Sequence, residues 1–211
     1  MLYILQEGLL DLMNKIAGVD EAGRGPLAGP VVAACVILPF GATHQKPIAG
    51  LRDSKKLTAK AREYLYNKIT AQAIDWAVGD ASVEEIEELN ILQATLLAMR
   101  RAVLALTQKP NLVLVDGNQG PKIPYETQTI IRGDSKEPAI SAASIIAKVT
   151  RDKIMLELDE RFPEYGFQKH KGYGTKQHID AIYQYGPSIH HRRGFEPIRT
   201  FMIQKALGDP L

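Results

Sequence analysis

Residues 16–38 read IAGVDEAGRGPLAGPVVAACVIL and hold two apolar segments on either side of a loop. The first apolar segment, residues 16–19, ends in the adjacent acids Asp20 and Glu21, and a loop of small residues follows. The second apolar segment, residues 31–38, is rich in β-branched side chains and has the length of a buried strand. The stretch therefore predicts two strands, a glycine-rich loop between them, and two carboxylates at the end of the first strand.

Helical and extended patterns alternate along the rest of the chain. A helix is expected at residues 58–73 with Thr58 as its N-cap, and Ser82 with Glu85 forms a capping box that opens an acidic helical turn. Further helices are expected at residues 90–106, 140–158 and 177–185, short strands at 73–78, 112–115 and 128–131, and residues 194–206 are ambiguous. This order predicts an α/β fold in which helices cover a central sheet.

Length and charge favour one domain with an uneven charge distribution. The chain has 211 residues, of which 45% are hydrophobic and 24% charged, as in ordinary globular proteins. We expect a single domain, residues 1–211, with a core over residues 16–160 and a helical, basic portion over 161–211. That portion holds 8 Lys and Arg against 4 Asp and Glu, whereas residues 1–160 hold 18 against 20. The contrast is a mild signal for a polyanionic partner.

Neither a membrane span nor a disulfide is expected. No apolar stretch reaches the ~18 residues that a span requires, and the N-terminus lacks the basic start of a signal peptide. Cys35 is the one cysteine, and its apolar surroundings predict a buried, inert thiol in a reducing compartment. These features indicate a cytoplasmic protein.

Four carboxylates follow extended segments. Asp20 and Glu21 follow residues 16–19, Asp116 follows 112–115, and Asp134 precedes the small-residue helix. Strand ends converge at one edge of an α/β sheet, where carboxylates would repel one another unless hard divalent cations join them. Two such ions about 4 Å apart would clamp the oxygens of a phosphoryl displacement.

Two considerations limit this interpretation. Each acid alone is equally compatible with a turn or a helix cap, and the metal site is favoured only by the four together. In addition, adjacent strand residues face opposite ways, so Asp20 and Glu21 share one site only if the strand ends or bulges there.

The glycine loop, residues 23–29, does not have a nucleotide fingerprint. Its third glycine comes four positions after the second rather than three, Pro26 intervenes, and a strand rather than a helix follows. The Gly-Lys-Ser/Thr of a P-loop is also missing. The loop is instead suited to bring backbone N–H groups and Arg24 close to a sugar-phosphate chain.

Several motifs together resemble one family. Residues 18–30 resemble the opening signature of ribonuclease HII, and the following segments continue the family's order: 53–57, 115–117, 133–136, 141–152 and 170–175. The resemblance runs from about residue 16 to about residue 201. It implies a ribonuclease H-like fold with a central mixed sheet and a C-terminal helical portion.

The resemblance also implies an activity. The expected enzyme is an endoribonuclease that degrades RNA in RNA–DNA hybrids and incises duplex DNA 5′ to an embedded ribonucleotide, as in ribonucleotide removal during replication and repair. The expected cofactor is Mg²⁺ or Mn²⁺, and the products carry 3′-hydroxyl and 5′-phosphate ends. One chain suffices for a site of this kind, so we expect a monomer.

Site residues follow from the same resemblance. It implies that Asp20, Glu21, Asp116 and Asp134 bind the metal ions, that Gly23, Arg24 and Gly25 contact the ribose 2′-hydroxyl, that Tyr173 stacks on the following deoxyribose, and that Lys55 or Lys56 contacts phosphates. A 2′-hydroxyl is the group that distinguishes RNA from DNA. The chemistry needs no histidine pair, so His190 and His191 are interpreted as surface or phosphate-facing residues.

Three alternatives stay open. A ribonuclease HIII-like hybrid nuclease would use similar chemistry, but that family carries an N-terminal binding domain and the first acids here stand at residues 20 and 21. Another two-metal nuclease would leave the glycine loop and Tyr173 unexplained. A non-catalytic nucleic-acid-binding module would use the basic tail and keep its binding without Asp20.

Overall fold

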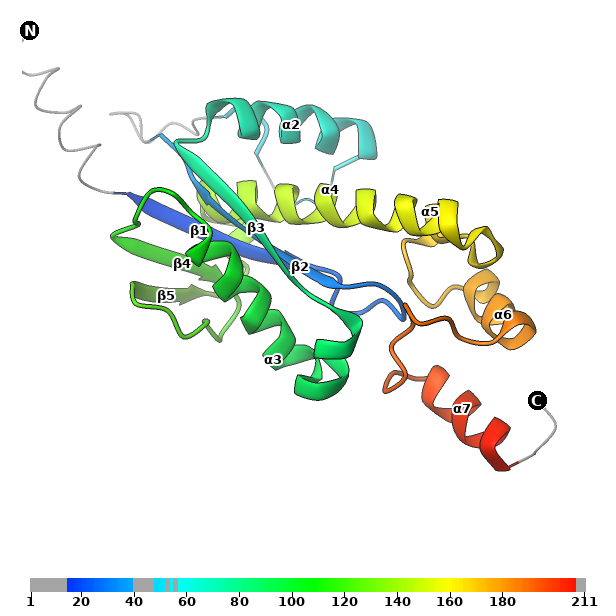
Figure 1. Cartoon of the computed structure of the whole chain (residues 1–211). Helices are drawn as coiled ribbons and strands as arrows, with labels where there is room; N and C mark the ends of the chain where they lie inside the picture. Colours follow the sequence, from blue (N-terminus) through cyan, green and yellow to red (C-terminus); the bar gives the residue numbers. More distant parts are fainter. Residues whose placement is uncertain (1–14, 40–47, 52–53, 55–56, 208–211) are drawn as a thin grey trace, which may run out of the picture.

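A mixed five-stranded sheet forms the centre of the molecule (Figure 1). The computed structural model describes residues 15–39, 48–51, 54 and 57–207. The strands lie in the order β3-β2-β1-β4-β5. Their bounds are β1, Ile16–Ala22; β2, Val31–Ile37; β3, Asp75–Ala81; β4, Leu112–Asp116; and β5, Glu126–Ile130. The first three strands pair antiparallel, whereas β4 and β5 run parallel to β1, so the predicted mixed α/β sheet is confirmed.

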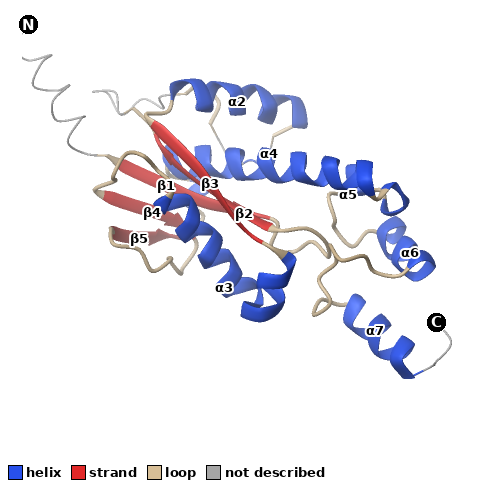
Figure 2. Ribbon diagram, in the orientation of Figure 1, coloured by secondary structure: helices blue, strands red, loops and turns tan. Residues whose placement is uncertain are grey.

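Helices cover both faces of this sheet (Figure 2). The described helices are α2, Ala59–Gln72; α3, Val83–Leu104; α4, Pro138–Arg161; α5, Phe167–His170; α6, Lys176–Tyr185; and α7, Ile198–Leu207, with short 3-10 turns η2, Gly133–Ser135, and η3, Pro163–Tyr165. Helix α3 packs on one face of the sheet, and α2 and α4 pack on the other. The three layers place α4 directly over β1.

The central strand β2 shows why the apolar run folds as it does. All seven of its residues are buried. Ala33 and Cys35 belong to the hydrophobic cluster on the α3 side, whereas Ala34 and Val36 belong to the cluster on the α4 side. A strand covered on both faces needs a continuous apolar sequence, and this strand has one. Cys35 is buried as predicted, and burial raises the pKa of its thiol.

Local signals set the helix starts correctly. Thr58 accepts a hydrogen bond from the amide of Ala61, and Ser82 and Glu85 form the predicted capping box. The helix predicted at residues 90–106 belongs to the longer α3, in which Asn90 adopts φ 68° and accepts bonds from the amides of the next turn. Strand β3 extends three residues beyond the predicted end at residue 78.

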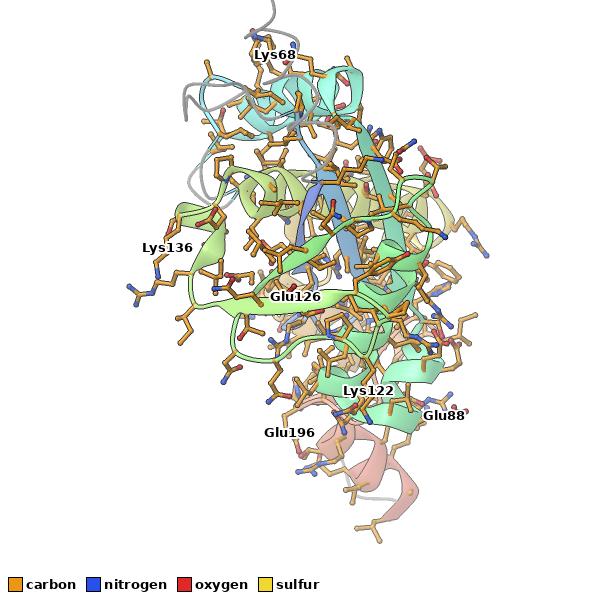
Figure 3. All side chains as sticks on the ribbon, turned by 90° about the vertical axis from the view of Figure 1, so that its left-hand side faces the viewer. Lys68, Glu88, Lys122, Glu126, Lys136 and Glu196 are labelled. Carbon is orange, nitrogen blue, oxygen red and sulfur yellow. The ribbon has the colours of Figure 1, made fainter. Side chains whose placement is uncertain are left out.

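The C-terminal helices lie beyond the end of the sheet. In Figure 3, Lys68 of α2 lies near the top, Glu126 of the edge strand β5 in the middle, and Glu196 in the lower part, where α7 continues below it. Leu27 and Ala28 of the glycine loop belong to the apolar clusters that hold α6 and the end of α4. The loop is therefore packed between the sheet and the C-terminal helices. None of the described helices is both long and apolar enough to cross a bilayer.

Candidate active site

Three of the four predicted acids meet at one edge of the sheet. Strands β1 and β4 pair in parallel up to Val19 and Val115, so Asp20 and Asp116 follow side by side. Asp20 is only 6% exposed. Burial raises the pKa of its carboxyl well above the usual range, and repulsion from Glu21 and Asp116 adds to the increase. Burial also raises the pKa of Glu21; the nearby Arg24 opposes this rise, and Asp116 adds to it.

The first strand ends close to these acids, without a bulge: its pairing with β4 stops at Val19, and β1 itself ends at Ala22. Pairing of β1 with β2 continues without interruption through Asp20, Glu21 and Ala22, because the chain leaves the strand only at Gly23, where φ is 96°. The side chain of Ser144 on α4 acts on the carboxyl of Asp20 in the opposite direction to burial and lowers its pKa. Oε1 of Glu21 lies 3.5 Å from Nη1 of Arg24. The carboxyls of Asp20 and Glu21 nevertheless interact at this sheet edge, and each affects the pKa of the other.

Asp134 is placed near this edge of the sheet by a hydrogen bond of the preceding residue, Gly133. The amide of Gly133 donates a 2.7 Å hydrogen bond to Oδ1 of Asp116, which ties η2 to the end of β4. Asp134 is half-buried and follows directly. Over the part of the chain that the structure describes, no three His, Cys, Asp or Glu side chains are arranged closely enough to hold a metal ion.

The donor set nevertheless fits a hard cation. All four side chains offer carboxylate oxygens, which Mg²⁺ and Mn²⁺ prefer. The raised pKa values of Asp20 and Glu21 show that their negative charges are unfavourable where they stand. A divalent cation bound by these carboxylates would offset the repulsion between their negative charges.

The glycine loop and the Tyr173 loop, residues 171–175, form one surface next to the acids. Arg24 and Gly25 are exposed, whereas Gly23 is buried. A Cβ on Gly25 would lie 3.8 Å from Cε1 of Tyr173, which is ordinary contact distance. The amide of Leu27 donates to the carbonyl of Gly172 at 2.8 Å, so the loops are also joined through their backbones. The predicted contact residues 23–25 and 173 are thus brought together, and Lys55 and Lys56 lie outside the described residues.

A pair of histidines holds the Tyr173 loop from behind. Nδ1 of His178 donates to the carbonyl of Tyr173 at 2.9 Å, and its Nε2 lies 3.0 Å from Nε2 of His191. Because a carbonyl only accepts, His178 carries its proton on Nδ1, and Nε2 of His191 must be the donor. Nδ1 of His191 then accepts from the amide of Ser188 at 2.9 Å. This chain of bonds requires both rings to be neutral.

His170 acts on the same loop. Its Nδ1 accepts from the amide of Gly172 at 3.2 Å, and its Nε2 donates to the carbonyl of Tyr165 at 2.9 Å. The interpretation of His191 as a surface or phosphate-facing residue is wrong, because His191 is 1% exposed. The sequence held a signal for His178, which shares the buried face of α6 with Ala181 and Ile182 at helical spacing.

We expect acid to destabilise the protein through these histidines. Burial lowers the pKa of His178 to about 4 and that of His191 to about 3, from an ordinary value of 6.5. The unfolded chain takes up protons below about pH 6.5 that the folded chain does not, so the free energy of unfolding falls as the pH drops from there toward 4. Each histidine contributes up to about 1.4 kcal/mol per pH unit.

Urea unfolding at about pH 7.5 and about pH 5.5 measures this effect. The variant His191→Gln is the control, because its side-chain amide keeps the donor but has no proton to gain, and its pH dependence should be weaker. Equal midpoints for the original protein at the two pH values would contradict the assignment.

Comparison with known proteins points to one family. The family model described as Ribonuclease HII matches residues 17–196. The chain is similar to a ribonuclease HII of Delftia acidovorans, with 58% identity over 196 residues that cover 93% of this chain and 82% of the relative.

Solved structures agree. The ribonuclease H2 of Pyrococcus horikoshii OT3 is 31% identical with a TM-score of 0.75, over 90% of this chain and 98% of that chain. Bst-RNase HIII in complex with Mn²⁺ has a TM-score of 0.70 over 92% of this chain and 71% of that chain, but its 17% identity makes it a likeness of fold alone.

Proposed function

The chain belongs to the ribonuclease HII family, and we propose that its catalytic, metal-binding residues are Asp20, Glu21, Asp116 and Asp134. The protein is a metal-dependent endoribonuclease that degrades the RNA strand of RNA–DNA hybrids. The observation that supports the four acids is the convergence of Asp20, Glu21 and Asp116 on one sheet edge, where burial and then repulsion between the acids raise the pKa of the first two. The bond from Gly133 to Asp116 supports the inclusion of Asp134.

The cofactor of this site is a divalent cation, Mg²⁺ or Mn²⁺. An all-carboxylate donor set suits either ion, and the fold neighbour Bst-RNase HIII was solved in complex with Mn²⁺. Held by these carboxylates, such ions would supply an activated water and positive charge at the scissile phosphate. The four acids would hold and orient this centre, and the side chain of Ser144 favours the charged form of Asp20.

The glycine loop and Tyr173 select the bond that is cut. The exposed backbone of Arg24 and Gly25 contacts the ribose 2′-hydroxyl, with Gly23 as the turn that presents it, and the exposed ring of Tyr173 stacks on the deoxyribose that follows. Water attacks the phosphorus on the 5′ side of the ribonucleotide, and the bond to the departing 3′ oxygen breaks. The products carry a 3′-hydroxyl and a 5′-phosphate.

The proposed role is the removal of ribonucleotides from DNA during replication and repair in the cytoplasm. Lys55 or Lys56 would contact phosphates beside the cut. A monomer is sufficient, since every residue assigned to the site comes from one chain. The match to the ribonuclease HII model favours this role over that of a ribonuclease HIII-like enzyme, and an enzyme family excludes a purely binding module.

A labelled DNA duplex with one embedded ribonucleotide tests the proposal. Incubation with Mg²⁺ or Mn²⁺ should produce a nick on the 5′ side of the ribonucleotide, and EDTA should abolish it. An all-DNA duplex of the same sequence should stay intact. Cleavage of a long hybrid without this nick would contradict the assignment of junction reading to the glycine loop and Tyr173.

Removal of the Tyr173 ring should impair incision more than binding. The ring is 45% exposed and lies against the position of Gly25. Stacking of an aromatic ring on a nucleotide is worth about 1–3 kcal/mol, so Tyr173→Ala should lower incision at a single ribonucleotide about 10- to 100-fold. Single-turnover rates and binding titrations measure the two effects separately.

Tyr183→Ala is the matched control for this variant. Tyr183 is 41% exposed on α6, and its ring meets Phe201 rather than the glycine loop. Its loss should leave incision unchanged. Equal rates for Tyr173→Ala and the original protein would remove Tyr173 from the site.

A further inference from the structure

Two fully buried arginines hold the glycine loop from inside the protein. Arg151 of α4 is 1% exposed, and Arg192, in the segment before α7, is 0% exposed. Figure 1 shows this segment reaching the loop between β1 and β2, and an isolated β-bridge joins Ala28 to His191 there. Neither side chain forms an ion pair with a carboxylate among the described residues; the nearest of their partners are backbone carbonyls.

Arg192 binds three carbonyls of the loop. Its Nη2 donates to the carbonyl of Gly23 at 2.6 Å, its Nη1 to that of Arg24 at 3.0 Å, and its Nε to that of Gly29 at 3.0 Å. A planar guanidinium can serve several acceptors in fixed directions at once, which an ammonium cannot. The guanidinium of Arg192 therefore fixes both ends of the loop.

Arg151 ties the same loop to the Tyr173 loop. Its Nη2 donates to the carbonyl of Ala28 at 2.9 Å, its Nε to that of Pro30 at 3.1 Å, and its Nη1 to that of Lys171 at 2.9 Å. A Cβ on Gly23 would overlap the side chain of Arg151, so this glycine is needed for the close approach. The two loops thus share one internal support.

The direction of these bonds decides what the loop presents outward. In a trans peptide the C=O and the following N–H point opposite ways, and the single cis peptide of the described residues is Glu196–Pro197. Because the carbonyls of Gly23 and Arg24 point inward to Arg192, the N–H groups of Arg24 and Gly25 point away from it. Among the hydrogen bonds of the described residues, none uses either N–H group. Both N–H groups therefore stay available to a substrate oxygen.

Burial of two positive charges close together costs free energy, so a structure that retains them indicates a specific role for the two arginines. Burial lowers the pKa of Arg192 to about 9, with repulsion from Arg151 adding to the decrease, and burial lowers the pKa of Arg151 to about 10. Apolar side chains of similar volume would fill this space at a smaller desolvation cost. The two positive charges also lie directly behind a surface that meets a phosphodiester chain, which they attract.

We propose that Arg192 and Arg151 are positioning residues for ribose recognition: they turn the carbonyls of the glycine loop inward, so that the N–H groups of Arg24 and Gly25 face the 2′-hydroxyl, and they lock this loop to the Tyr173 loop. The proposal rests on the proposed function of these two loops. It predicts that loss of these arginines lowers incision at a single embedded ribonucleotide more than it lowers cleavage of a long RNA–DNA hybrid.

Arg192→Lys tests the proposal, with Arg193→Lys as the matched control. A lysine keeps the charge but cannot reach the three carbonyls from one nitrogen, so incision at a single ribonucleotide should fall at least tenfold, and cleavage of a long hybrid, where every position offers a 2′-hydroxyl, should fall several-fold less. The exposed neighbour Arg193 uses only its amide, toward Glu87, and its substitution should change neither rate. Rates are compared at a temperature where circular dichroism shows each variant folded.

A double-mutant cycle separates positioning from a merely structural role. If Arg192 acts through the two loops, Tyr173→Ala should reduce incision less in the Arg192→Lys protein than in the original protein. Additive effects, or equal losses on both substrates, would overturn the proposal. If Arg192→Lys does not fold, Arg151→Lys carries the same test. Absence of single-ribonucleotide incision in the original protein would instead refute the proposed function itself.

Discussion

Replacement of Asp20 with asparagine is expected to lower turnover about a thousandfold and to leave the protein folded. The substitution removes a charged oxygen from the proposed metal centre, and the loss of several kcal/mol of transition-state stabilisation corresponds to this factor. The side chain lies where β1 passes β4, beside Asp116 and in contact with Ser144. An asparagine oxygen can still accept the 2.7 Å bond that the amide of Glu21 donates to Asp20. Steady-state cleavage of an RNA–DNA hybrid measures the effect.

Stability measurements make this prediction more specific. In EDTA, the melting temperature of Asp20→Asn should equal or exceed that of the original protein, because the substitution removes a buried charge that Glu21 and Asp116 repel. Asp116→Asn should show the same loss of activity. Asp180→Asn is the control, since Asp180 pairs with Lys176 on the exposed surface of α6. Full activity of Asp20→Asn, or its unfolding in EDTA, would contradict the assignment.

Local patterns were sufficient to predict most of the architecture. The run at β2 is apolar throughout because both of its faces are covered, and Thr58, Ser82 and Glu85 mark helix starts through bonds within one turn. The strand order and the direction of β4 were not predictable, since they depend on pairings between segments almost a hundred residues apart. The kink at Asn90 was also missed, because its φ of 68° is compensated by its own side chain rather than by a glycine.

The site likewise has a part that the sequence predicted and a part that it did not. Acids at the ends of apolar segments indicated the carboxylate edge, and the structure brings Asp20, Glu21 and Asp116 together there. The support behind the glycine loop left no local signal: Arg192 contacts Gly23 across 169 positions, and Arg151 contacts Pro30 across 121. The position of Arg151 on a long helix with acidic residues gives no sign that its donors are used by carbonyls inside the protein.

The short distance between β1 and α4 also depends on Gly18, which the sequence gives no reason to single out. Gly18 stands two positions before Asp20 on the same face of β1, and a Cβ there would overlap the backbone of Ala139 and Ile140 at the start of α4. The helix can approach this closely only over a glycine. One turn further along α4, the same approach brings Ser144 to Asp20. Gly18 thus sets the spacing on which the geometry of the carboxylate edge depends.

Gly18→Ala is therefore expected to lower the free energy of unfolding by about 3 kcal/mol or more, because backbone rather than a flexible side chain must move. For a chain of this length, that corresponds to a decrease of about 10 °C in melting temperature. Gly194→Ala is the control: no atom lies within 4 Å of its added Cβ, and its backbone does not have positive φ. It should change stability by less than about 0.5 kcal/mol.

Thermal unfolding of the two variants measures this difference, and equal melting temperatures would show that α4 can shift away from β1 without cost. Such a shift would also move Ser144, so residual activity of folded Gly18→Ala protein reports whether the carboxylate edge tolerates a displaced helix.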